Sequence, residues 1–233
     1  MKGGRAVEDY RHENKYFISM AGYQMLRTRL RAMMELDEHT RCEDGKYLVR
    51  SLYFDDYCQS GLLDKVEGIQ NREKFRIRFY DYDDSFIRLE AKQKIGELTK
   101  KLAAPLTREQ TDCILRGDTW FLYDAGASQP LLRNFYYKCR TRLLKPAVIV
   151  DYYREAYTFM DVRITFDMNL SSGAYRTDLF GRDIRTIPVF PSDRTIMEVK
   201  FDDALPYAVR QLLAPLSASR SAISKYELCR DFQ

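Results

Sequence analysis

The amino-acid sequence predicts an α+β fold, built on an antiparallel sheet that can close into a barrel with helices outside it. Three observations lead to this fold class. Most of the chain alternates apolar and polar residues with a period of two, helix signals are confined to a few segments, and the polar faces of the predicted strands are mainly basic. No linker or repeat divides the 233 residues, so we expect a single domain spanning residues 1–233.

Helix signals occur in three segments: 19–34, 107–116 and 203–213. Ser19 is a suitable N-cap for the first segment, where apolar residues recur at three- and four-residue spacing. Thr107 and Gln110 form a capping box for the second. The third carries a helical apolar pattern and ends before Pro215.

Seven segments are predicted strands: 11–15, 47–55, 74–80, 86–94, 147–154, 161–168 and 196–201. Segment 74–80 has the clearest alternation, because Lys74, Arg76 and Arg78 share one face and the residues between them are apolar. Segment 47–55 alternates less cleanly. Each of the others presents an apolar face and a polar or charged face.

The charged faces of these strands are strongly basic. Their four acids are Glu13, Glu90, Asp167 and Glu198, and their eleven bases are Arg11, Lys15, Lys74, Arg76, Arg78, Arg88, Lys92, Lys94, Arg154, Arg163 and Lys200. These faces therefore hold a net charge of +7, although the whole chain carries only +4. Crowded like charges on neighbouring strands repel unless a polyanion neutralises them. An ordinary solvated sheet face remains the alternative interpretation.

A barrel with these charged faces inside would enclose a cationic tunnel, and helices would cover its apolar outer faces. Such an interior suits a chain of phosphates with a divalent metal, because Arg and Lys bind phosphate oxygens and a hard cation takes carboxylate and phosphate oxygens. The sequence has no Gly-rich phosphate loop or Walker motif. We therefore expect the phosphates to be bound by side chains from strands.

Several other classes of protein are disfavoured. The five cysteines are scattered and never spaced as Cys-x-x-Cys, which argues against a disulfide framework or a zinc site and favours a reducing cytoplasm. Only His12 and His39 are available for a histidine-based mechanism. We also expect no secretory signal peptide and no membrane span in this chain.

Short motifs along nearly the whole chain resemble the VTC domain of polyphosphate polymerases, within the triphosphate tunnel metalloenzyme (CYTH-like) superfamily. Eight motifs occur in order: Arg11-His-Glu13-Asn-Lys15-Tyr16, Ser51-Leu-Tyr53-Phe-Asp55, Lys74-Phe-Arg76-Ile-Arg78, Glu90-Ala-Lys92-Gln-Lys94, Tyr153-Arg154-Glu-Ala-Tyr157, Val162-Arg163-Ile-Thr-Phe-Asp167, Glu198-Val-Lys200 and Ser224-Lys225-Tyr226. Each motif alone is weak, whereas the ordered set is specific.

The resemblance implies a closed tunnel of about eight antiparallel strands that binds ATP and inorganic polyphosphate with Mn²⁺ or Mg²⁺. It implies these phosphate ligands: Lys15, Arg76, Arg78, Lys92, Arg154, Arg163, Lys200 and Lys225. Further contacts are expected from Arg11, Lys74, Lys94, Tyr152 and Ser224, and from Lys100 or Lys101. Glu198 is the implied metal ligand, with Glu90 and Glu13 as further acidic candidates. The alternative for Glu13 and Glu90 is that they only neutralise adjacent bases.

The activity implied by the resemblance is transfer of the ATP γ-phosphoryl group to a growing polyphosphate chain. Relatives in the hydrolytic branch have an acidic residue where this chain has Arg11, which favours the polymerase. Eukaryotic polymerase subunits carry a further Lys where this chain has Ala222, and Arg220 is a candidate replacement. A triphosphatase of the same fold and a non-catalytic polyphosphate or nucleic-acid binder remain open. Nucleic acid is not expected, because many aromatic residues fall on the apolar faces.

Overall fold

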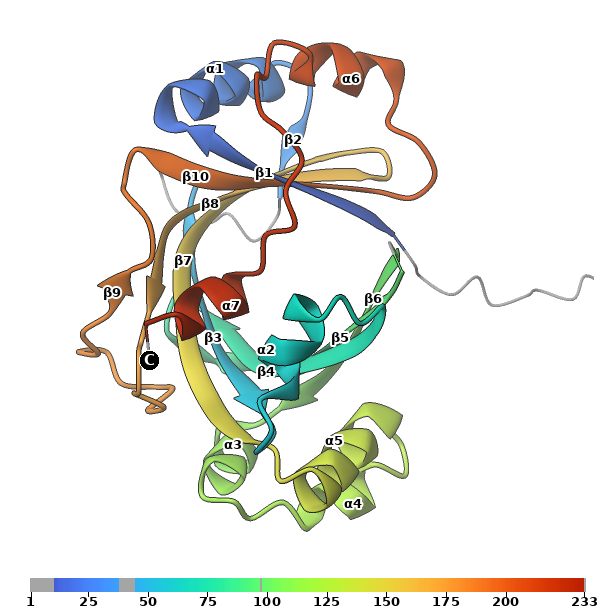
Figure 1. The fold of residues 1–233 in the computed structure, drawn as a ribbon, viewed down its shortest axis with the longest axis vertical. Coiled ribbons are helices and arrows are strands. Elements are labelled where there is room, and N and C mark those ends of the chain that lie inside the picture. The colour runs from blue at the N-terminus through green and yellow to red at the C-terminus, as the bar shows by residue number, and fades with distance from the viewer. Residues whose placement is uncertain (1–10, 38–44, 97, 233) are drawn as a thin grey trace, which may run out of the picture.

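The fold is centred on an antiparallel sheet that curls around its own concave face (Figure 1). The structure is a computed structural model that describes residues 11–37, 45–96 and 98–232. His39 and Cys42 lie outside the described residues. Ten strands make up the sheet: β1 (His12–Ser19), β2 (Glu35–Leu36), β3 (Tyr47–Asp55), β4 (Asn71–Tyr80), β5 (Asp83–Ile95), β6 (Leu98–Leu106), β7 (Lys145–Phe159), β8 (Val162–Ser172), β9 (Ile187–Pro188) and β10 (Arg194–Phe201). Eight of them follow the path β1-β10-β8-β7-β3-β4-β5-β6, while β2 pairs with β7 and β9 with β8.

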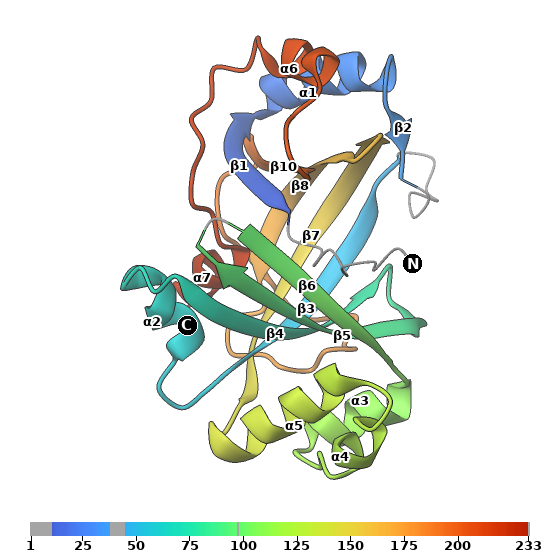
Figure 2. The ribbon, with the colours of Figure 1, turned by 90° about the vertical axis from the view of Figure 1, so that its right-hand side faces the viewer.

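The two edge strands of this path, β1 and β6, do not join in a continuous ladder. They meet at one bridge, where the amide of Arg11 donates to the carbonyl of Thr99 at 3.2 Å and the amide of Thr99 donates back at 3.3 Å. Figure 2 shows the two strands diverging from that region, and Arg11–Thr99 is the bridge between them among the residues that the structure describes. The predicted closed barrel is therefore wrong in this respect, and the sheet is an open curl.

Helices cover the outer surface of the curl and part of its concave face (Figure 1). Those that the structure describes are α1 (Met20–Arg31), α2 (Ser60–Val66), α3 (Arg108–Leu115), α4 (Phe121–Ala125), α5 (Pro130–Thr141), α6 (Tyr207–Leu213) and α7 (Lys225–Arg230). None of the helices in this described part of the chain is long and apolar enough to cross a membrane.

The two predicted helix caps are confirmed. The hydroxyl of Ser19 accepts a hydrogen bond from the amide of Gly22 at 3.1 Å, and Thr107 and Gln110 form the expected capping box. The third predicted helix starts at Tyr207 rather than at residue 203, because Pro206 keeps an extended backbone and disfavours helical backbone in the residue before it. Helices α2, α4, α5 and α7 were not predicted.

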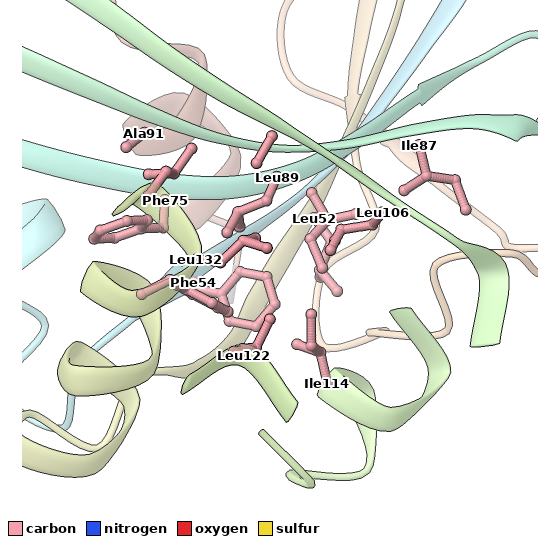
Figure 3. Packing of buried hydrophobic residues seen from close by; sticks show 14 of the residues in the cluster. Leu52, Phe54, Phe75, Ile87, Leu89, Ala91, Leu106, Ile114, Leu122 and Leu132 are labelled. Carbon is pink, nitrogen blue, oxygen red and sulfur yellow. The ribbon is translucent and has the colours of Figure 1, made fainter. Parts of the chain in front are cut away.

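Two apolar clusters cover the outer face of the sheet, as the strand alternation predicts. The larger cluster packs α3, α4 and α5 against β3, β4, β5 and β6 through residues such as Phe54, Leu89 and Leu132 (Figure 3). The second packs α1 and α6 against β8 and β10, with Leu26 and Val209 fully buried. Because the apolar side chains point outward, the charged side chains of the same strands point into the curl.

A third cluster lies on the concave side and forms one wall of the interior. There α7 packs Tyr226 and Cys229 against inward residues of β3, β7 and β8, including Tyr53, Val150 and Leu170. The helix places Lys225 at the concave surface, where it is 8% exposed. The C-terminal helix therefore contributes to the same interior as the strands.

Candidate active site

The concave side of the sheet encloses a cavity of about 1000 Å³. Fifteen basic and four acidic side chains line it, so the interior is strongly positive. All sixteen site residues expected from the sequence are among the lining residues: Arg11, Glu13, Lys15, Lys74, Arg76, Arg78, Glu90, Lys92, Lys94, Tyr152, Arg154, Arg163, Glu198, Lys200, Ser224 and Lys225. The structure thus brings the whole predicted set together, while the role of each residue stays a prediction.

Strands β4 and β5 form a ladder of charged pairs along this cavity. Its cross-strand pairs are Arg78 with Arg88, Arg76 with Glu90, Lys74 with Lys92 and Arg72 with Lys94. Three of these four pairs join like charges, which destabilises adjacent strands unless counter-charge is present. The charge pattern of the ladder therefore suits a polyanion.

An arginine cluster surrounds one carboxylate in the middle of the ladder; it consists of Glu90, Arg76, Arg78 and Lys101. Glu90 is 1% exposed, and its carboxylate lies 2.6 Å from Nη2 of Arg76 and 3.1 Å from Nζ of Lys101. Burial raises the pKa of Glu90, but Arg76, Arg78 and Lys101 outweigh burial and hold the pKa well below its usual range. These contacts fit a carboxylate that neutralises adjacent bases.

The two arginines of this cluster are held in fixed orientations. Arg76 donates to the hydroxyl of Tyr53 at 2.8 Å. Arg78 donates to the hydroxyl of Ser51 at 2.9 Å and to that of Tyr152 at 3.0 Å. Tyr152, which was expected to contact the substrate, thus supports Arg78. Fixed guanidinium groups can bind phosphate oxygens without first being ordered.

A lysine cluster is centred where β1 pairs with β10, and Lys92 of β5 and Lys225 of α7 reach it from other elements. It consists of Glu13, Glu198, Lys15, Lys92, Lys200 and Lys225. Lys92 Nζ lies 2.6 Å from Glu13, and Lys200 Nζ lies 2.9 Å from Glu198. Lys15 contacts both carboxylates, at 3.0 Å and 3.9 Å. Glu13 is paired with Lys200 and Glu198 with Lys15 across the strands, so the two glutamates are diagonal neighbours.

Charge is distributed unevenly in the lysine cluster. Burial, reinforced by the neighbouring Lys15, lowers the pKa of Lys92 to about 7, although Glu13 opposes the shift. Burial raises the pKa of both glutamates, yet the surrounding lysines outweigh burial and hold both values below the usual range. The glutamates are therefore ionised at neutral pH, whereas Lys92 is only partly protonated.

Asp167 lies beneath the cavity and anchors two of the predicted ligands. It is fully buried, accepts hydrogen bonds from Nε and Nη2 of Arg154 at 2.7 and 2.9 Å, and lies 2.6 Å from Nζ of Lys225. Burial raises the pKa of Asp167, but Arg154 and Lys225 outweigh burial and hold it at about 2. The motif containing Asp167 was identified, but its anchoring role was not predicted.

The remaining predicted ligands lie towards the edges of the cavity. Arg163 pairs with Asp37 at 2.8 Å, a partner for which the sequence gives no signal. Arg11 pairs with Asp202 at 2.7 Å. The hydroxyl of Ser224 accepts from the amide of Glu227, so Ser224 caps α7 as well as lining the cavity. Other lining residues were not predicted as ligands: Arg72, Arg88, Tyr47, Tyr53, Tyr80 and Phe86.

Glu13 and Glu198 fit a divalent metal better than Glu90 does. Among the residues that the structure describes, no group of three or more His, Cys, Asp or Glu side chains could hold a metal ion. A site for Mg²⁺ or Mn²⁺ here would therefore combine the two ionised glutamates with phosphate oxygens, which is a donor set that these cations accept. Glu13 and Glu198 are diagonal neighbours and can offer two carboxylates to one cation, whereas the printed ion pairs of Glu90 surround it with Arg76, Arg78 and Lys101.

The curled sheet and its basic cavity define a tunnel-fold protein with a phosphate-related function. The chain belongs to the VTC domain family, whose model matches residues 10–231. A search among curated proteins finds no significant match.

Solved structures share the fold at low sequence identity. A "putative adenylate cyclase" from Bacillus halodurans is 14% identical with a TM-score of 0.52, over 92% of this chain and 93% of that chain. The PH1819 protein of Pyrococcus horikoshii is 14% identical with a TM-score of 0.50, over 94% and 97% of the two chains. The PH1012 protein of the same organism is 9% identical with a TM-score of 0.52, over 94% and 99%. At these identities the likenesses show a shared fold.

Proposed function

We propose that this protein is a polyphosphate polymerase, which transfers the γ-phosphoryl group of ATP to the end of a growing inorganic polyphosphate chain. The observation that carries the proposal is the cavity, in which fifteen bases and four acids line the concave face of a VTC-family sheet. This charge balance suits a chain of phosphates rather than a single anion. Arg11 also supports the polymerase, because hydrolytic relatives have an acidic residue at this position. In this structure Arg11 pairs with Asp202.

In this reaction a terminal phosphate oxygen of polyphosphate attacks the γ-phosphorus of ATP. The bond from that phosphorus to the β–γ bridging oxygen breaks, ADP leaves, and no covalent enzyme intermediate is needed. The total charge of products equals that of reactants. The protein's contribution is therefore to position both phosphate chains and to stabilise the charge that develops on the transferred group.

The predicted arginine ligands and the predicted lysine ligands would divide this work. Arg76, Arg78, Arg154 and Arg163 would contact the oxygens of the ATP phosphates. The predicted lysine ligands would bind and align the phosphates of the acceptor chain: Lys15, Lys92, Lys200 and Lys225. Glu198, with Glu13, would hold Mn²⁺ or Mg²⁺. Such a cation, when bound, would supply positive charge that offsets the charge of the phosphates.

Incubation of the purified protein with ATP and Mn²⁺ or Mg²⁺ tests the proposal. We expect release of ADP together with long-chain polyphosphate, resolved by electrophoresis. Orthophosphate without polymer would indicate a triphosphatase of the same fold. Salt-sensitive binding without metal-dependent turnover, unaffected by Glu198→Ala, would indicate a non-catalytic binder. Absence of both ADP release and polymer would overturn the polymerase.

A further inference from the structure

The inward faces of β4 and β5 change in chemical character from one end of the cavity to the other. At one end the inward residues are Tyr80 and Phe86, whose ring centroids lie 6.0 Å apart. Every other inward position on the two strands is charged: Arg72, Lys74, Arg76 and Arg78 on β4, and Arg88, Glu90, Lys92 and Lys94 on β5. The ladder thus has an aromatic end, formed by Tyr80 and Phe86, and a basic end, formed by Arg72 and Lys94.

The aromatic end offers a surface for a planar ring. Phe86 lines the cavity and is 40% exposed, and the guanidinium of Arg88 lies 4.4 Å from its ring centroid. The ring of Tyr47 lies 5.7 Å from that of Tyr80. Aromatic rings and arginine planes stack on nucleobases of any kind.

Hydrogen-bonding groups lie beside these rings. Nη2 of Arg163 lies 2.8 Å from the Asp37 carboxylate and 3.4 Å from the Tyr47 hydroxyl, so both oxygens lie near the aromatic end. A carboxylate at such a place can accept a hydrogen bond from a ribose hydroxyl. The basic end presents only cations on these two strands, and cations bind phosphates without recognising a base.

The chemistry of transfer supplies a second argument. The attacking and leaving oxygens lie roughly in line on opposite sides of the transferred phosphoryl group. Acceptor and departing ADP must therefore extend in opposite directions along the cavity. Inward residues on one strand follow each other at about 6.6 Å, so Arg78 and Arg76 lie one and two such steps beyond Tyr80. This order matches a nucleoside followed by its phosphates.

We propose that the cavity has a fixed polarity, in which the nucleoside of ATP stacks at the aromatic end and the polyphosphate acceptor enters from the basic end. This inference rests on the polymerase function. It assigns Phe86 and Tyr80 to the nucleoside, and Arg72 and Lys94 to the acceptor chain. The lysine cluster lies on the acceptor side, because Lys92 pairs with Lys74 on the ladder and contacts Glu13.

Comparison of ATP with inorganic tripolyphosphate tests the nucleoside end, because both carry three phosphates and only ATP has a base. We expect Phe86→Ala to weaken ATP binding about tenfold in titration calorimetry and to leave tripolyphosphate binding within about twofold. Phe86→Trp keeps a stacking surface and should retain the ATP affinity. Tyr57→Ala removes an aromatic side chain that is 78% exposed and does not line the cavity, so it serves as the matched control.

The basic end is tested with the double variant Arg72→Ala/Lys94→Ala. We expect its affinity for long-chain polyphosphate to fall at least about fivefold more than its affinity for ATP. Equal losses of ATP and tripolyphosphate in Phe86→Ala, or no loss of either, would overturn the nucleoside site. Equal losses of ATP and polyphosphate in the double variant would overturn the polarity.

These outcomes differ from failure of the polymerase. If the wild-type protein binds ATP with the expected Phe86 dependence but forms no polymer, the polymerase proposal fails and the nucleoside site stands. If polymer forms and Phe86→Ala does not discriminate between ATP and tripolyphosphate, the polymerase stands and the polarity fails. Thermal unfolding of each variant checks that it is folded.

Discussion

The arginine cluster and the lysine cluster line the same cavity but hold their charge in different ways. Glu90 is enclosed by Arg76, Arg78 and Lys101, and the guanidinium groups remain charged at every physiological pH. Glu13 and Glu198 instead lie among four lysines, one of which has its pKa lowered to about 7. The arginine cluster is thus a fixed positive surface, whereas the lysine cluster can change its charge when a ligand or metal binds.

The largest expected effect separates the two kinds of carboxylate. Glu198→Gln removes the carboxylate that we propose as a metal donor, and we expect turnover to fall by about 10²–10³-fold or more, with a higher Mn²⁺ concentration required for half-maximal activity. Steady-state ADP release across a Mn²⁺ titration measures both quantities.

Glu90→Gln is the matched control for Glu198→Gln. It leaves Arg76 and Arg78 without their buried counter-charge, so we expect a loss of about 3 kcal/mol of stability and no shift in the Mn²⁺ requirement. A shift of the Mn²⁺ requirement in Glu90→Gln, with none in Glu198→Gln, would reverse the assignment of the metal ligand.

A charge-conserving exchange tests whether the arginine cluster acts through its geometry. Arg76→Lys keeps the charge but loses the planar fork that binds Glu90 and Tyr53, so we expect kcat to fall at least about tenfold. Lys200→Arg, in the lysine cluster, should change kcat by no more than about threefold, because Lys200 acts as a point charge. Similar losses in the two variants would show that the clusters do not differ in this way.

The pH dependence of binding tests the titratable lysine. A phosphate chain favours protonated Lys92, so binding raises its pKa and takes up a proton above pH 7. We expect the affinity for long-chain polyphosphate to fall by up to tenfold per pH unit between about pH 7.5 and 9, because its internal phosphates stay fully ionised throughout this range. Titration calorimetry in buffers of different ionisation enthalpy measures the proton uptake directly. Lys92→Arg stays charged and should flatten the profile; an equally steep profile would assign the proton to another group.

Strand alternation predicted that most side chains of the two clusters share the inward face of the sheet, whereas Lys225 and Lys101 were expected only from the family resemblance. Once Arg76 and Arg78 are placed inward, the parity of β4 places Lys74 and Arg72 on the same side, and pairing with β5 adds Lys92. The local pattern therefore determined the composition of the cavity wall. The same alternation places Arg72 on the inward face, but Arg72 was not predicted as a ligand.

Features that depend on distant contacts could not be predicted. Arg50 lies on the outward face of β3 and is 2% exposed, because Asp151 and the carbonyl oxygens of Leu179 and Gly181 bind its guanidinium. No sequence pattern near Arg50 predicts these partners. The prediction that the sheet closes was wrong for a similar reason, since closure depends on the angle between β1 and β6 rather than on the pattern within either strand.

The smallest expected effect concerns the stability of the empty cavity. The pKa of Lys92 is lower in the folded chain than in the unfolded chain, so the unfolded state binds more protons between about pH 7 and 10. Lys92 therefore destabilises the ligand-free fold most below pH 7, and this penalty is relieved as the pH rises above 7. Lys92→Met should raise the free energy of unfolding at pH 7, as measured by urea denaturation.

The gain is limited because the Lys92 side chain is 32% exposed, and screening keeps it below about 1 kcal/mol. The advantage of Lys92→Met should shrink towards pH 9.5, where Lys92 of the wild type is neutral in the folded protein. Tripolyphosphate should remove the advantage at pH 7, because it stabilises the charged wild type more than the variant. A variant that is less stable than the wild type at both pH values would show that Lys92 stabilises the ligand-free fold through its contact with Glu13. The charge of the lysine cluster would then be as constant with pH as that of the arginine cluster.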